Sequence, residues 1–195
     1  MNSFLPRIKA PTSASAQIFW GEIAPSEHVA QFYENENVLL DALTGYVSGG
    51  IKADECAIVI ATPEHRAELH KRLREAGVDV WRAQTENRYI SLDAETTLAR
   101  FMVDRLPDEK LFTDCVASLL QQATADGRRV RAFGEMVALL WARGEAAATV
   151  RLEFLWQAFC QSHAFSLFCA YPKAGLTDDP TRSLAHICAA HSRVV

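Results

Sequence analysis

The stretch VRAFGEMVALLWARG, residues 130–144, decides the fold of this chain. A short β-type run leads directly into an amphipathic helix that carries Trp141. Glu135 therefore follows an expected buried parallel strand, at the sheet edge where open α/β folds bind ligands. A carboxylate at this place costs desolvation free energy unless it meets water, a partner group or a ligand. Two roles stay open for Glu135: lining a pocket or capping the following helix.

Two further apolar runs surround this stretch, CAIVIA at 56–61 and FSLFCA at 165–170. Continuous apolar, β-branched runs are typical of strands that are covered on both faces. Thr62 and Pro63 then suit the N-cap and first position of a helix. A helix N-terminus can also hold a small polar group, so this turn is either a capped helix or part of a site.

Helical spacing of apolar residues predicts helices after and between the strands. We expect Gly49-Gly50 to end the first helix, Val78–Val80 to form a short strand, and one helix to carry Leu98, Phe101 and Met102. Strands that alternate with helices predict a three-layer α/β domain, with a mainly parallel sheet and helices on both faces. The expected helices cover 38–47, 63–76, 112–123, 136–143 and 146–163, with a further strand at 89–92.

The composition limits the possible functions. With 20 basic and 24 acidic residues the net charge is −4, which disfavours nucleic-acid binding. No segment approaches the ~20 apolar residues that span a bilayer, so we expect no membrane insertion. Five cysteines without a CxxC pair favour a reducing compartment, and we read four of them as core residues. We therefore expect a soluble, cytoplasmic protein.

Motifs for catalysis are missing from the sequence. There is no GxxxxGK[ST] loop, no GxGxxG turn and no GxSxG elbow. The prediction is a protein that is not an enzyme and uses no cofactor.

The histidines do not suggest a metal site in the sequence. No second histidine lies at ligand spacing from His28, so we predict no bound metal. His186, Cys188 and His191 read as helix surface and tail. Glu153 lies one helical turn before Trp156, either beside a pocket or as a partly buried acid paired with an arginine such as Arg151 or Arg88.

Five segments of the sequence occur in a characteristic order: HVAQFYENENVLLDAL (28–43), CAIVIATPEHRAEL (56–69), RYISLDAETTLARFMVDRLPD (88–108), VRAFGEMVALLWARG (130–144) and RLEFLWQAFCQSHAFSLFCAYP (151–172). Together they resemble one family, the methanogen/methylotroph DcmR sensory domain (MEDS). The resemblance covers about residues 27–173, which leaves 1–26 as an N-terminal extension and 174–195 as a C-terminal extension with a short helix near 181–191. Asn87, Arg105, Glu145 and Gln157 depart from the family pattern, the first two standing where glycine is expected.

The resemblance implies a RecA/KaiC-like fold without a phosphate loop and a role as a signal-input module in prokaryotic regulators. Such a domain is proposed to sense small hydrocarbon derivatives and to act through a histidine kinase or a transcription regulator. The alternative is a scaffold without a ligand, which docks a kinase or assembles with itself as a homodimer. The expected ligand-binding residues are His28, Tyr33, Thr62, His65, Glu135, Met136 and Tyr171, with Trp141, Glu153 and Trp156 supporting or lining the site.

Overall fold

The computed structural model describes residues 27–173 and 191–194. The short strand expected near residues 18–20 and the helix expected at 181–191 lie, wholly or almost wholly, outside these residues, as do His186 and Cys188.

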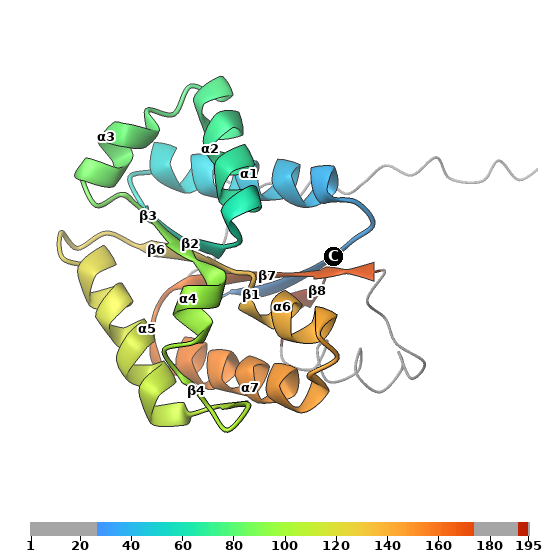
Figure 1. The fold of residues 1–195 in the computed structure, drawn as a ribbon. Helices are drawn as coiled ribbons and strands as arrows, with labels where there is room; N and C mark the ends of the chain where they lie inside the picture. The colour runs from blue at the N-terminus through green and yellow to red at the C-terminus, as the bar shows by residue number, and fades with distance from the viewer. Residues whose placement is uncertain (1–26, 174–190, 195) are drawn as a thin grey trace, which may run out of the picture.

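A six-stranded, all-parallel sheet forms the middle layer (Figure 1), in the order β3-β2-β6-β7-β1-β8. Its central strands β2 and β6 are buried along their whole length, which is why their sequences are continuously apolar or nearly so. The strands are β1 His28–Tyr33, β2 Cys56–Ala61, β3 Tyr89–Asp93, β6 Val130–Gly134, β7 Ser166–Pro172 and β8 Arg193–Val194.

Helices cover both faces of this sheet (Figure 1), so the predicted three-layer α/β fold is confirmed. One face carries α1 Glu36–Lys52, α2 Pro63–Glu75 and α3 Val80–Thr85. The other carries α4 Ala94–Leu98, α5 Glu109–Ala123, α6 Met136–Ala142 and α7 Ala146–Ser162. A two-stranded antiparallel hairpin of β4 Met102–Val103 and β5 Leu106–Pro107 connects α4 to α5.

Alternation along the strands divides the buried residues between two cores. On β7, Cys169 and Tyr171 belong to the core under α5–α7, whereas Phe168 and Ala170 belong to the core under α1–α3. Successive side chains of a strand point to opposite faces, so residues two apart share one face. This rule determines which of the predicted site residues can meet.

The start of α2 agrees with the sequence, whereas two other predicted elements were wrong. The Thr62 side chain accepts a hydrogen bond from the His65 backbone N–H and caps α2. Residues Val78–Val80 do not form a strand, because the Asp79 side chain accepts from the Arg82 N–H and starts α3. Helix α4 ends at Leu98, and Met102 belongs to β4.

The expected helix end at Gly49-Gly50 was also wrong, because α1 continues to Lys52. Gly50 has a packing reason to be glycine: a Cβ atom there would lie 2.9 Å from Cδ of Arg131. The chain leaves the helix at Asp54, which has a φ of 59°.

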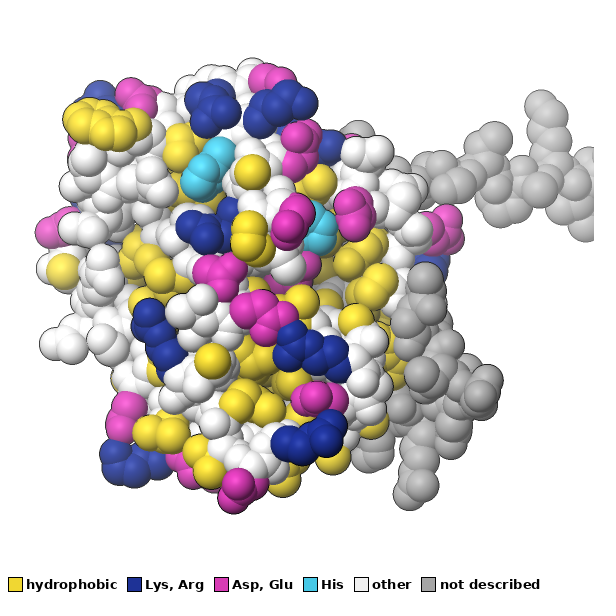
Figure 2. All heavy atoms as spheres, in the orientation of Figure 1, with side chains coloured by type: hydrophobic (Ala, Val, Ile, Leu, Met, Phe, Trp, Pro, Cys, Tyr) yellow, Lys and Arg dark blue, Asp and Glu magenta, His cyan; other side chains and the backbone are white. Residues whose placement is uncertain are grey.

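The basic cluster of Arg128, Arg129 and Arg131 serves the fold. Arg131 is buried and ion-paired with buried Glu55, which also pairs with Arg129, while Arg128 pairs with Asp54 and Asp126. Figure 2 shows acidic and basic side chains interspersed over the face that it presents. Among the described residues, no helix is long and apolar enough to cross a membrane.

Candidate functional site

Glu135 lies at the carboxyl edge of the sheet, and its carboxylate is held from inside the protein. Oε2 accepts a hydrogen bond of 2.8 Å from the Thr62 backbone N–H. Oε1 lies 2.7 Å from Nδ1 of His65. Glu135 makes no side-chain hydrogen bond that caps its own helix α6, so it instead ties the end of β6 to the start of α2.

The neighbours of Glu135 respond to its charge. The hydrogen bond to Glu135 raises the pKa of His65 above its ordinary value, although burial opposes this. Burial raises the pKa of Tyr33 to about 12, and the charges of Glu135 and Glu36 add to the effect. Four predicted residues therefore gather here: Tyr33, Thr62, His65 and Glu135. The polar groups of Thr62, His65 and Glu135 hydrogen-bond to one another.

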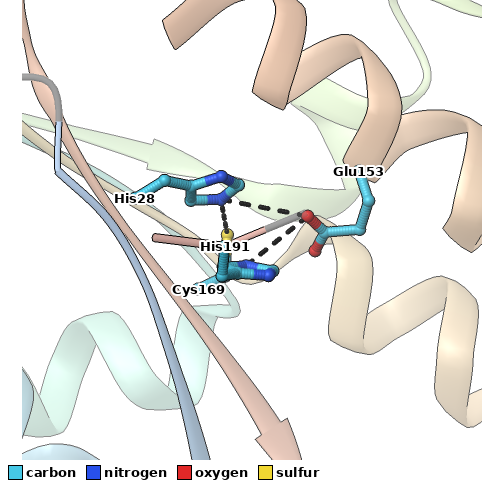
Figure 3. A group of neighbouring side chains, drawn as sticks. All are labelled: His28, Glu153, Cys169 and His191. Carbon is cyan, nitrogen blue, oxygen red and sulfur yellow. Dashed lines mark hydrogen bonds and ion pairs between the residues drawn. The ribbon is translucent and has the colours of Figure 1, made fainter. Parts of the chain in front are cut away.

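A second group lies on the opposite face of the sheet, and we call His28, Glu153, Cys169 and His191 the polar centre (Figure 3). Figure 3 shows the four side chains converging from β1, α7, β7 and the segment before β8. One donor atom from each residue lies within 4.8 Å of the other three. Nε2 of His28 is 3.4 Å from Sγ of Cys169 and 3.9 Å from Oε2 of Glu153, which is 3.6 Å from Nε2 of His191.

The polar centre is deeply buried. Glu153 is only 3% exposed, and neither of its carboxylate oxygens has a hydrogen-bond partner among the described residues. Desolvation raises the pKa of Glu153 to about 8 and, together with the Glu153 charge, raises the pKa of the Cys169 thiol well above its ordinary value. An ionised acid in this setting is costly unless a neighbouring group or a bound cation compensates its charge.

The polar centre does not have the geometry of a cysteine–histidine–acid triad. In such a triad one ring nitrogen of the histidine serves the nucleophile and the other is oriented by the acid. Here the same Nε2 of His28 faces both Cys169 and Glu153. The raised pKa of Cys169 also disfavours the thiolate that a nucleophile needs.

Two aromatic residues, Tyr171 and Trp141, lie next to the polar centre on the same side of the sheet. The Tyr171 ring lies 6.3 Å from the His191 ring and 6.4 Å from the Trp141 ring. The Tyr171 hydroxyl and the Trp141 indole nitrogen are buried without a hydrogen-bond partner among the described residues. Polar atoms without partners are rare inside proteins, so this side of the sheet is chemically unusual.

The structure thus divides the predicted site residues into separate groups. Met136 and Trp156 are core residues, and Trp156 packs against Phe112 with ring centroids 4.9 Å apart. The predicted arginine partner of Glu153 was wrong: histidines face this acid, while Arg151 pairs with Glu109.

Sequence reasoning missed two members of the polar centre. Cys169 was read as a core residue, which its burial confirms, but its position two residues before Tyr171 on the same strand face was the available signal. His191 was read as surface or tail, which was wrong because its side chain is fully buried. The argument against a metal also rested on sequence spacing, and the tertiary structure supplies the second histidine.

Two surface clefts flank α2, and neither is lined by a predicted site residue. The first lies against α1 and is lined by Asp41, Thr44, Glu68 and Arg72 among others. The second lies toward α3, beside Trp81. The interior polar centre is therefore the stronger candidate site.

Fold and site together define a three-layer α/β domain without a phosphate loop and with an interior group of polar side chains. The profile of the MEthanogen/methylotroph, DcmR Sensory domain (MEDS) matches residues 27–192, and the chain belongs to this family. The match includes His191 and thus all four residues of the polar centre. A comparison with curated proteins finds no match. The family assignment indicates a signal-input role and favours a non-catalytic domain.

Proposed function

We propose that this chain is a signal-input domain that binds a small organic ligand beside the polar centre and relays its presence to a partner protein. Family membership supports the signal-input role. One observation carries the ligand: the buried Tyr171 hydroxyl and Trp141 indole N–H, on neighbouring rings, lack hydrogen-bond partners among the described residues. Two such groups on neighbouring rings favour a molecule that bonds to both.

The chemistry of these groups indicates the class of ligand. An indole N–H only donates a hydrogen bond, and a phenol hydroxyl can donate one, so the ligand would present an acceptor oxygen. Phe32 stacks on Tyr171 at 5.5 Å and adds an apolar wall. A small hydrocarbon derivative with an alcohol, carbonyl or carboxylate oxygen suits this combination.

A route for the signal leads from Tyr171 through His191 to β8. His191 contacts the Tyr171 ring and lies two residues before β8, which pairs with the edge of β1. A ligand shifts an equilibrium only by binding one arrangement more tightly than another. We propose that the ligand favours one arrangement of this edge, and that a histidine kinase or a transcription regulator reads it.

The test is a screen of small alcohols, aldehydes and carboxylates by thermal shift, followed by titration calorimetry of any hit. We expect a selective ligand that binds the unaltered protein and the Tyr89→Phe control, a buried tyrosine in the other core. Loss of one hydrogen bond in Tyr171→Phe or Trp141→Phe should weaken binding by roughly tenfold. Equal affinity in all four proteins, or no selective ligand, would contradict the proposal.

A second candidate function, a protein-interaction scaffold, is favoured by one observation. Trp81 on α3 is 75% exposed at the rim of the second cleft, and aromatic side chains are enriched at protein–protein interfaces. If Trp81→Ala abolishes partner capture while Tyr171→Phe and Phe154→Ala, an exposed aromatic on α7, leave it intact, the scaffold is the better account.

A further inference from the structure

We propose that His28, Glu153, Cys169 and His191 form a binding site for one divalent transition-metal ion, of which zinc is the best fit. The site does not depend on the organic ligand proposed above. It rests on four converging donors and on the buried Glu153 carboxylate that lacks a hydrogen bond among the described residues.

The distances within the polar centre are close to those of a metal site. For tetrahedral zinc with bond lengths of about 2.0–2.3 Å, neighbouring donor atoms lie roughly 3.4–3.6 Å apart. Three contacts within the polar centre measure 3.4 Å for nitrogen to sulfur and 3.6 and 3.9 Å for nitrogen to oxygen. All donors lie within 4.8 Å of one another, so rotamer adjustments of less than about 1.5 Å would complete the coordination.

The charges of the donor set also balance. Two neutral imidazoles, one thiolate and one carboxylate carry a total charge of −2, which a divalent cation neutralises. A bound cation removes the proton from a coordinating thiol and stabilises a carboxylate that would otherwise be buried alone. Such a neutral set can be buried at much lower cost than its separate members.

The kinds of donor atom select the class of metal. Magnesium and calcium prefer sets of oxygen ligands, which this group does not offer. Mixed imidazole, thiolate and carboxylate ligands suit zinc and its neighbours in the first transition row. Four protein ligands make a closed site, which is typical of a structural rather than a catalytic metal.

A metal here would join parts of the chain that are far apart in sequence. His28 begins β1, Cys169 lies on the adjacent strand β7, and Glu153 reaches from α7. His191 brings the segment before β8 to the same point. The ion would therefore fasten β8 to the body of the domain.

Cobalt(II) titration of the chelator-treated full chain tests the site directly, because cobalt replaces zinc and is visible spectroscopically. We expect one equivalent to bind, with a thiolate-to-cobalt charge-transfer band in the near ultraviolet and the intense visible bands of tetrahedral cobalt. Zinc should displace it. Hydrogen exchange at residues 191–194 should slow when zinc is bound.

Cys160→Ser is the matched control for Cys169→Ser, since Cys160 is a buried cysteine outside the four-residue group. Cys169→Ser should abolish the charge-transfer band, whereas Cys160→Ser should keep it. His191→Ala should weaken zinc binding by at least about 100-fold and keep the circular dichroism of the folded domain. Should Cys169→Ser fail to fold, His191→Ala and the spectrum of the unaltered protein still decide.

Three results would overturn the metal site: no one-to-one binding, a cobalt complex without the thiolate band, or equal zinc affinity in His191→Ala. The two proposals fail separately. A chain that binds zinc but no organic ligand contradicts only the proposed function, and a chain that binds the organic ligand but not zinc contradicts only this inference.

Discussion

The His65–Glu135 pair shows how one carboxylate can organise the carboxyl edge of a sheet. The Glu135 carboxylate accepts a hydrogen bond from the Thr62 N–H and pairs with the His65 ring nitrogen. Both groups belong to the start of α2, which therefore compensates the charge of Glu135. The same pair should make stability depend on pH. The folded pKa of His65 is raised, so the stabilising effect of protonated His65 is fully present below the unfolded value of about 6.5 and is lost as pH rises through the folded pKa.

We expect His65→Gln to lower the free energy of unfolding by about 1–3 kcal/mol below pH 6.5, and by less at higher pH. Urea unfolding across this range measures it. In a Glu135→Gln background the pH dependence of the His65→Gln effect should shrink, because only the smaller effects of Glu36 and Glu64 then raise the pKa of His65. A His70→Gln background should preserve it. A difference that stays constant with pH would contradict the pairing.

The buried ion pair between Glu55 and Arg131 lies at the amino edge of the sheet and gives a second prediction at the residue scale. Glu55 is 4% exposed and pairs with Arg131, which is 2% exposed. Glu55→Gln should cost about 3–5 kcal/mol in urea unfolding, because it leaves a guanidinium buried without its counter-charge. The exposed pair Lys110–Asp114 is the control, and Asp114→Asn should change stability little. If both variants changed the free energy of unfolding equally, a group other than Glu55 would have to compensate the charge of Arg131.

At the scale of elements, the hairpin of β4 and β5 carries a local conflict. Asp104 and Arg105 occupy its two-residue turn with φ values of 47° and 66°. Turns with two positive φ values favour Asn-Gly or Asp-Gly, since glycine has no Cβ penalty there. Glycine was expected at 105 from the family pattern, and the backbone now explains that expectation.

Arg105→Gly should therefore raise the free energy of unfolding by about 1 kcal/mol. Arg105→Ala is the control, because it removes the same exposed side chain and its ion pair with Glu145 without relieving the backbone. Chemical denaturation of both variants distinguishes them. If alanine stabilises as much as glycine, the effect belongs to the arginine side chain rather than to the turn.

At the scale of the whole molecule, the polar centre connects segments that the chain keeps far apart. Because a metal would bind only the folded arrangement, zinc at about 100 times its Kd should raise the free energy of unfolding by about 2.7 kcal/mol. Glu153→Gln removes a poorly compensated buried acid. Without metal, the free energy of unfolding of this variant should therefore exceed that of the parent by more than about 1 kcal/mol. Zinc should raise the free energy of unfolding of the variant only a little, because one metal ligand is lost. Thermal unfolding with and without zinc measures both, and a variant that gains as much as its parent would contradict the role of Glu153.

Local patterns in the sequence determined the layers of this protein. Continuous apolar runs predicted the buried strands β2, β6 and β7, and Thr62-Pro63 predicted the start of α2, because burial and helix capping depend on residues close in the chain. The predicted strand at Val78–Val80 failed because a single side chain, Asp79, capped a helix instead.

Only the tertiary structure decided which polar side chains meet. Strand order placed His28 beside β7, and alternation turned Tyr171 toward the core under α5–α7 but Tyr33 toward the core under α1–α3, which separated residues expected to share one site. His191 carried no signal of its burial, since its neighbours in space come from residues up to 163 positions away. Periodicity reports how deeply a residue is buried, whereas its contacts across the fold depend on the order of the strands, which no local pattern encodes.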